Sequence, residues 1–145
     1  MKGKVVLVTG ANGGLGVYVT QAFLDAGATV IGTSRKILQS DFQSPGFSAM
    51  TAEISTPNGA KVLVNQVVAR CGRIDVLAHT VGAFTGGQSI AETDPATFQK
   101  MFDINFNSAF YLLRAALPAM RKTGNGRIVA IGSRAAVDPG PGVGT

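Results

Sequence analysis

The residues with the clearest chemical potential are the glycines of a turn near the start of the chain. The turn, Thr9 to Gly16, reads T-G-A-N-G-G-L-G. Glycine adopts backbone angles closed to other residues and lets a ligand approach the main chain. A turn that leads into a helix also presents unpaired N–H groups and partial positive charge, which suit a pyrophosphate. The alternative is a glycine turn that merely joins two elements.

A strand and a helix must hold this turn in place. Lys4 to Val8 is a short apolar run typical of a buried parallel strand. Beyond the turn, apolar residues recur at helical spacing, which predicts that one helix face packs inward through Leu15, Val19, Ala22, Phe23 and Ala26. Gly27 stands where this helix would end. Strand, glycine turn and helix open a dinucleotide-binding βαβ unit, and that context favours nucleotide binding over a plain connection.

The glycine spacing is T-G-x-x-x-G-x-G, carried by Thr9, Gly10, Gly14 and Gly16. This pattern resembles the short-chain dehydrogenase/reductase family, whose members bind NAD(H) or NADP(H). The resemblance implies an α/β fold with a doubly wound, Rossmann-like parallel sheet of about five strands in the order 3-2-1-4-5, with helices on both faces. It implies hydride transfer between the nicotinamide cofactor and a carbonyl or alcohol. The cofactor residues that it implies are Thr9, Gly10, Asn12, Gly13, Gly14, Leu15, Gly16, Ser34, Arg35, Glu53, Ile54, Thr80, Val81 and Gly82.

Two positions bear on the adenosine end of such a cofactor. Dinucleotide folds place an acidic residue after the second strand, where it bonds the ribose 2′-OH, whereas this chain has Ser34 and Arg35. A guanidinium pairs with a 2′-phosphate, so NADP(H) is favoured over NAD(H); a solvated arginine is the alternative. The resemblance implies that Glu53 and Ile54 hold the adenine, with Glu in place of the commoner Asp. An exposed strand end is the alternative for that pair.

Three further residues stand at positions of the family's motifs. Asn105, in F-D-I-N-F, matches the asparagine that kinks a long helix and holds a water in a proton relay, although an asparagine in a helix can also bond its own main chain. Ser133 resembles the catalytic serine that hydrogen-bonds the substrate carbonyl. His79 stands where the family has asparagine, and we interpret it as structural rather than as a general base.

The family pattern breaks at its proton donor. The resemblance requires a tyrosine with a lysine four residues later, whose positive charge lowers the tyrosine pKa. Here Ala22 lies four residues after Tyr18, and Ala115 lies four residues after Tyr111. We therefore expect one dinucleotide-binding domain over residues 1–145, truncated before that motif and weak or inactive, with 138–145 resembling the loop that leads into the absent helix. The alternative is a non-catalytic nucleotide-binding or assembly module.

Size and composition limit the other functions. The 145 residues are 46% hydrophobic with mean hydropathy +0.26, which suits one globular core. No apolar run reaches the roughly 20 residues needed to span a bilayer, so we expect a cytoplasmic protein without membrane contact. A single cysteine, Cys71, excludes an intramolecular disulfide. The net charge of +5 comes from scattered cations, which fit an anionic small ligand better than nucleic acid. No metal site is expected.

The remaining pattern predicts strands at 28–32, 47–52, 74–78 and 126–132, and helices at 57–70 and about 95–120. The last strand is apolar on both faces and has no predicted cover, so we expect a homo-oligomer or another compensating arrangement. Core packing explains most of an apolar stripe in the last helix, and a dimer face the rest, for Phe106, Phe110, Leu113, Leu117 and Met120.

Overall fold

Five parallel strands form the sheet, in the predicted order β3-β2-β1-β4-β5. The computed structural model describes residues 1–138 and 140. The strands are β1 Val5–Thr9, β2 Thr29–Ser34, β3 Phe47–Thr51, β4 Val76–His79 and β5 Arg127–Ala130. The doubly wound parallel architecture is confirmed, and β2 runs two residues further than expected, through Thr33 and Ser34.

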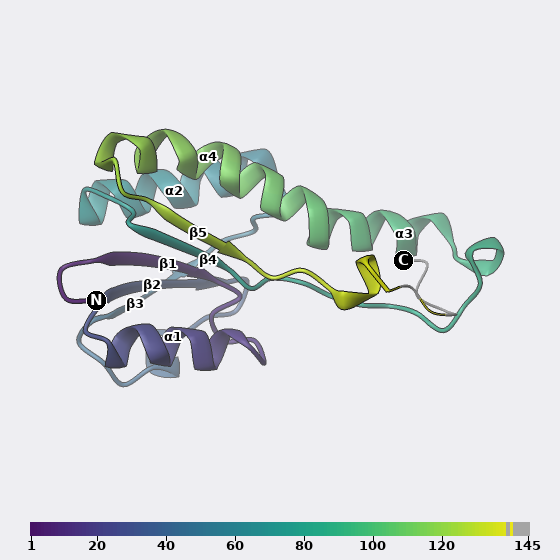
Figure 1. The fold of residues 1–145 in the computed structure, drawn as a ribbon, viewed down its shortest axis with the longest axis horizontal. Helices are drawn as coiled ribbons and strands as arrows, with labels where there is room; N and C mark the ends of the chain where they lie inside the picture. Colours follow the sequence, from purple (N-terminus) through teal and green to yellow (C-terminus); the bar gives the residue numbers. More distant parts are fainter. Residues whose placement is uncertain (139, 141–145) are drawn as a thin grey trace.

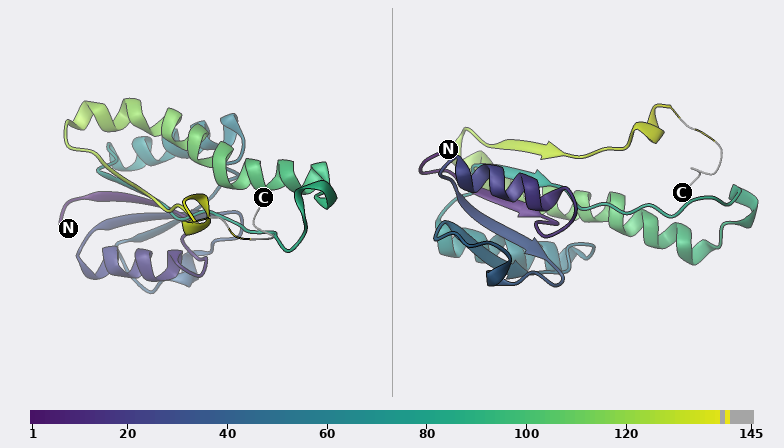
Figure 2. Two further views of the ribbon diagram at one scale, coloured as in Figure 1. Left: turned by 45° about the vertical axis from the view of Figure 1, so that its right-hand side comes forward. Right: turned by 90° about the horizontal axis from the view of Figure 1, so that it is seen from below.

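Helices cover both faces of the sheet, as predicted. Helix α1 lies on one face, and α2 and α4 lie on the other (Figure 1). The α-helices are α1 Gly16–Asp25, α2 Pro57–Cys71, α3 Pro95–Phe102 and α4 Ser108–Thr123. A π-helical segment, η3 Asp103–Asn107, joins α3 to α4, and short 3₁₀ turns are η1 Gln39–Asp41, η2 Ile90–Glu92 and η4 Arg134–Ala136. Both α3 and the segment after β5 extend beyond the end of the sheet (Figure 2).

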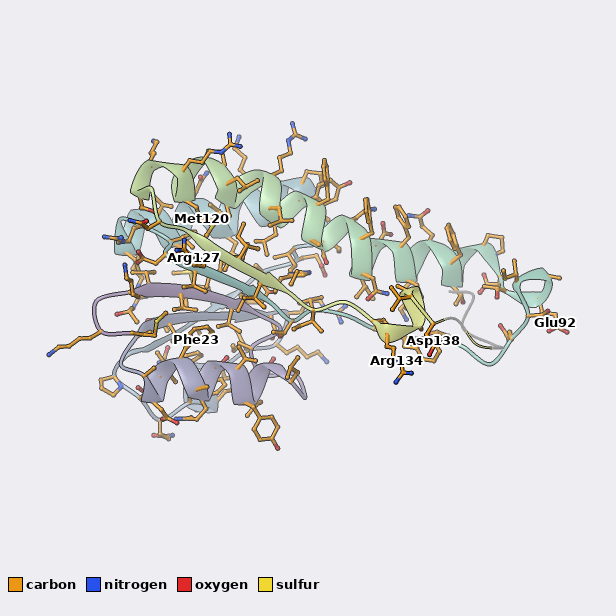
Figure 3. The ribbon with its side chains drawn as sticks, in the orientation of Figure 1. Phe23, Glu92, Met120, Arg127, Arg134 and Asp138 are labelled. Carbon is orange, nitrogen blue, oxygen red and sulfur yellow. The ribbon has the colours of Figure 1, made fainter. Side chains whose placement is uncertain are left out.

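The core has two layers because each inner strand buries both of its faces. Val6 and Val8 of β1 pack with Leu24 of α1 on one face. Leu7 packs with Leu63 of α2 and Leu112 of α4 on the other. Figure 3 shows side chains filling the space between the sheet and its helices, with Phe23 on the α1 side and Met120 on the α4 side. Together these contacts fix the strand ends at which the turn lies.

Helix α1 is rotated relative to the predicted orientation. Val19 and Phe23 pack against the core, but three predicted inward residues are exposed: Leu15, Ala22 and Ala26. The buried line is Gly16, Thr20 and Leu24. The reason is the close contact between Gly16 and the carbonyl of Gly10, which turns the glycine, rather than Leu15, toward the sheet.

Core packing, expected to explain most of the apolar stripe in the last helix, holds for only two of its five residues, and the dimer face expected for the rest stays a prediction. Of that stripe, Met120 is buried and Leu113 packs against the core, whereas Phe106, Phe110 and Leu117 are exposed. The helix buries another line of residues: Ser108, Leu112, Ala116 and Met120. The aromatic side chains instead stack along the outer surface, with ring centroids 4.9 Å apart for Phe102 and Phe106.

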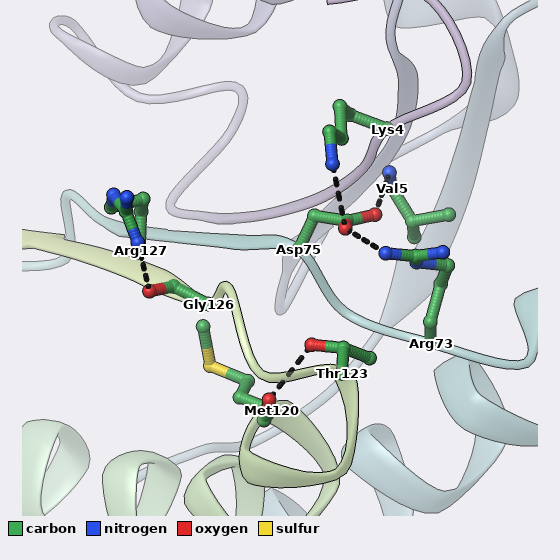
Figure 4. Close-up of polar contacts among 8 residues, drawn as sticks. All are labelled: Lys4, Val5, Arg73, Asp75, Met120, Thr123, Gly126 and Arg127. Atoms are coloured by element: carbon green, nitrogen blue, oxygen red, sulfur yellow. Dashed lines mark hydrogen bonds and ion pairs between the residues drawn. The ribbon is translucent and has the colours of Figure 1, made fainter.

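A buried carboxylate ties the other end of the sheet together. Asp75 accepts a hydrogen bond from the Val5 amide at 2.9 Å and pairs with Lys4 and Arg73 (Figure 4). Burial alone would raise the pKa of the Asp75 carboxyl, but the Val5 amide and the two cations outweigh it and lower that pKa. This cluster anchors the start of β1 to the segment just before β4.

Strand β5 forms an open edge of the sheet. All four of its residues are exposed, including Ile128 and Val129 at 39% and 52%. The prediction of an uncovered apolar strand is therefore confirmed for the described residues. Among those same residues, no helix combines the length and apolar character that crossing a membrane would demand.

Candidate functional site

A cavity of about 530 Å³ opens at the carboxyl ends of the strands. Parallel sheets with helices on both faces bind ligands at this end. Every predicted cofactor residue except Thr9 lines the cavity: Gly10, Asn12, Gly13, Gly14, Leu15, Gly16, Ser34, Arg35, Glu53, Ile54, Thr80, Val81 and Gly82. Residues distant in the sequence therefore meet around one space.

The glycine turn forms one wall of the cavity. Gly10 has φ +68°, and the Gly13 amide donates to its carbonyl at 2.8 Å. A Cβ on Gly16 would lie 1.9 Å from the Gly10 oxygen, so only glycine fits there. A Cβ on Gly14 would meet nothing within 4 Å. The two glycines thus differ. Gly16 allows the start of α1 to pack against the backbone of Gly10, and Gly14 leaves the main chain of the cavity wall uncovered by a side chain.

The start of α1 faces this space without a cap. Its N-cap residue, Leu15, makes no side-chain hydrogen bond, whereas Thr56 caps α2 and Asp94 caps α3. An uncapped helix start in a cavity leaves main-chain N–H groups for a ligand. Anionic oxygens suit these donors best because the helix dipole is positive at this end.

The side of the cavity that we expect to face the adenosine carries one cation, Arg35, and one carboxylate, Glu53, which is already hydrogen-bonded. Arg35 is exposed and, among the described residues, is in no ion pair. Glu53 accepts hydrogen bonds from the Ser55 hydroxyl at 2.6 Å and the Ser55 amide at 3.2 Å. The Ser55 hydroxyl is the main reason that the pKa of Glu53 is lowered; burial opposes it, and the Ser55 amide and the Arg35 charge assist. The oxygen of Ser34 accepts from the Lys36 amide at 3.2 Å.

Two cavity residues have a second role. Asn12 donates from Nδ2 to the Asp41 carboxylate at 3.1 Å, which holds η1 against the glycine turn. Ile54 lines the cavity but is also buried in the core layer beneath α2. Its apolar side chain therefore contributes a fixed surface to the floor of the site.

Thr9 is the one predicted cofactor residue that does not line the cavity. Its side chain is fully buried, and its Oγ1 lies 2.8 Å from Nδ1 of His79. Among the described residues, Thr9 is not part of the cavity lining. Its place is behind the glycine turn. His79 has the structural setting that we expected, since it is buried and both ring nitrogens lie near hydroxyl groups.

Asn105 clamps the loop after β4. Its amide accepts from the Ala83 N–H and donates to the Ala83 carbonyl, both at 2.9 Å. The side chain therefore bonds this loop and not its own helix, and the residue lies in η3, where the long helix changes its winding. Ser133 is exposed, and its Oγ accepts from the Ala135 amide at 3.2 Å. Neither residue is among those described as lining the cavity.

Several lining residues were not anticipated from the sequence: Thr33, Ala52, Ser55, Ile104, Ser108 and Ile131. Thr33 pairs with Thr9 in the register of β1 and β2. It was missed because β2 was predicted to end at Gly32, one residue before Thr33. Ser108 lies three residues after Asn105, about one helical turn. That spacing was a usable signal.

Neither tyrosine reaches the cavity within the described part of the chain. Tyr18 is 75% exposed on α1. Tyr111 lines a separate groove of about 630 Å³ between α2 and α4. The described residues therefore place no phenol at the cavity.

Comparisons with known proteins agree with this fold. A family model described as short chain dehydrogenase matches residues 4–145. A short chain dehydrogenase of Pseudocercospora fijiensis is 32% identical over 97% of this chain and 48% of its own, and the ketoacyl reductase HetN of a Nostoc species is 36% identical over 93% and 49%. The solved structure of ElxO with NADP bound has TM-score 0.91 at 29% identity, covering 99% of this chain and 60% of that one. The chain thus spans about half the length of these curated relatives.

Proposed function

Because the chain belongs to the short-chain dehydrogenase family, we propose that its glycine-lined cavity binds a nicotinamide dinucleotide and prefers NADP(H) to NAD(H). The observation that carries the proposal is the uncapped start of α1 opening, beside Gly14, into a cavity of about 530 Å³. Its donor set fits a diphosphate, and its size is in the range of small-molecule sites. The NADP in the ElxO structure supports the same cofactor class.

Each part of the cofactor has residues suited to it. The amides of Gly14 and Leu15 would hold the pyrophosphate, and Arg35 the 2′-phosphate. Glu53 and Ile54 would border the adenine, and Thr80 to Gly82 the nicotinamide half. When bound, the cofactor supplies or accepts a hydride. Ser133 would hydrogen-bond a small carbonyl substrate, and Asn105 would order a water through the loop that it holds.

We further propose that the 145-residue chain catalyses hydride transfer slowly or not at all. They contain no tyrosine followed four residues later by lysine, and neither Tyr18 nor Tyr111 lines the cavity. The loss of general acid–base help costs typically 10²–10⁴-fold in rate. A second candidate, a non-catalytic nucleotide-binding or assembly module, is favoured by this missing phenol together with the exposed β5 edge.

Calorimetric titration with NADPH and NADH tests the binding proposal. We expect saturable binding of both, with NADPH tighter. No binding of either at millimolar concentration would contradict it. A parallel assay of NADPH oxidation with ketones, aldehydes and quinones separates the two functions. Turnover at rates typical of enzymes, about 1–10³ s⁻¹, would contradict slow catalysis, whereas binding with no detectable turnover would favour the non-catalytic module.

A further inference from the structure

His79 lies at the end of β4 between two hydroxyl groups from different elements. The residue is 4% exposed. Nδ1 is 2.8 Å from Oγ1 of Thr9 on β1, and Nε2 is 3.4 Å from Oγ of Ser108 on α4. One imidazole therefore bridges the central strand and the helix that covers it.

The hydrogen atoms in this bridge can be placed by counting donors. The Ser108 hydroxyl donates to the Ile104 carbonyl, and it has only one hydrogen to give. Toward His79 its oxygen must accept, so the proton of the neutral ring is on Nε2. Nδ1 then accepts from the Thr9 hydroxyl. Every hydrogen-bonding group in this chain of contacts is satisfied, which buried polar groups require.

We propose that His79 is a positioning residue that holds the phosphate-binding turn in register with the helical wall of the cavity. Thr9 directly precedes Gly10, and the Thr80 hydroxyl donates to the Thr9 carbonyl at 2.7 Å. At the other end, Ile104 and Ser108 line the cavity. The imidazole thus fixes the distance between the two walls that a dinucleotide would contact. This inference rests on the proposed cofactor function.

The same contacts exclude a nucleophilic role for Ser108. A serine nucleophile passes its proton to histidine, but this hydroxyl hydrogen is directed at the Ile104 carbonyl. Nδ1 contacts a hydroxyl instead of the carboxylate that would stabilise an imidazolium. Both side chains are also buried. The geometry therefore suits support of the site and not chemistry on a substrate.

Two variants test the proposal by NADPH titration. His79→Leu removes both contacts, and Thr9→Val removes the donor to Nδ1 while keeping the side-chain shape and, since Thr9 does not line the cavity, without touching the ligand. We expect each to raise the Kd for NADPH about tenfold. In the His79→Leu background, Thr9→Val should have no further effect. His79→Asn, which restores an acceptor near Nδ1, should recover most of the affinity.

A matched control separates positioning from general destabilisation. Ile74→Val removes one methylene from a fully buried core residue on the segment that leads into β4. It should lower the melting temperature and leave the Kd unchanged. A folded Thr9→Val variant that binds NADPH with wild-type affinity would overturn this inference and leave the proposed function standing. Equal weakening of NADPH binding by Ile74→Val would do the same. If His79→Leu does not fold, the Thr9→Val variant alone provides the test. Wild-type protein that binds neither NADPH nor NADH would overturn the proposed function and this inference with it.

Discussion

Arg35 is the single side chain on which the expected preference for NADP(H) depends. It lines the cavity and, in the described part of the chain, forms no ion pair, so its guanidinium is available to a phosphate. Arg35→Ser should weaken NADPH binding by roughly 10–100-fold, the value of a charged hydrogen bond, and leave NADH binding nearly unchanged. Lys36→Ser, at an exposed neighbour outside the described cavity lining, is the control. Equal losses for both nucleotides in Arg35→Ser would refute this role.

His79 also makes the stability of the chain depend on pH. Burial lowers the pKa of His79 in the folded chain, and it is the only histidine. As pH falls below about 6.5, His79 becomes protonated in the unfolded chain but stays neutral in the folded chain. Stability is thus full above that pH and declines below it, by up to roughly 1 kcal/mol at pH 5.5. Chemical denaturation at pH 7.5 and 5.5 should show a smaller decline for His79→Asn; an identical decline would exclude His79 as the source.

For single residues, the sequence predicted which ones line the cavity better than it predicted their hydrogen-bond partners. The glycines, Arg35 and Glu53 were identifiable because local spacing and strand ends are visible in a chain. The bond from His79 to Ser108 was not, because it joins residues 29 positions apart through a helix whose rotation the sequence leaves open. That Thr9 belongs to the cofactor site stays a prediction; its hydroxyl is turned toward His79, 70 positions away, a contact that the sequence did not reveal.

In the glycine turn and α1, Gly14 and Gly16 have different structural roles. Gly16→Ala should destabilise the fold by about 1–3 kcal/mol, because its Cβ would lie 1.9 Å from the Gly10 oxygen. Gly14→Ala meets no atom within 4 Å and should leave stability within about 1 kcal/mol of the wild type, while its methyl group narrows the cavity and weakens nucleotide binding. Denaturation curves and NADPH titrations of both variants test this. Equal effects on stability would contradict the distinction.

Helix rotation was the main error of element-level prediction. Periodicity alone favoured Leu15, Ala22 and Ala26 as the inward face of α1, but the backbone contact at Gly16 sets the face. In α4 the large aromatic residues seemed the natural core, yet the small residues Ser108 and Ala116 face the sheet. Close packing against a sheet favours small side chains, which hydrophobicity does not rank highly.

For the molecule as a whole, the open β5 edge leads us to propose a homo-oligomer. Its residues are exposed on both faces, and such an edge invites pairing with another chain. Val129→Lys should therefore lower the mass measured by analytical ultracentrifugation toward that of a monomer. Val62→Lys is the matched control, since it places the same charge at a similarly exposed valine on α2. A monomeric wild type, or dissociation by both variants, would contradict the proposal.

The fold itself could be predicted almost completely. The alternation of apolar runs and helical patterns predicted which segments form strands and helices, and the strand order was implied by the family resemblance of the glycine turn. That 1–145 behaves as one dinucleotide-binding domain stays a prediction. Residues 139 and 141–145, which belong to the segment expected to resemble a loop before the absent helix, lie outside the described residues.

A crystal structure of the chain grown with NADP⁺ tests the central claim most directly. We predict the pyrophosphate within hydrogen-bond distance of the main-chain amides at the start of α1, with the 2′-phosphate beside Arg35. Side chains filling that cavity, or a nucleotide bound only elsewhere on the surface, would contradict the account.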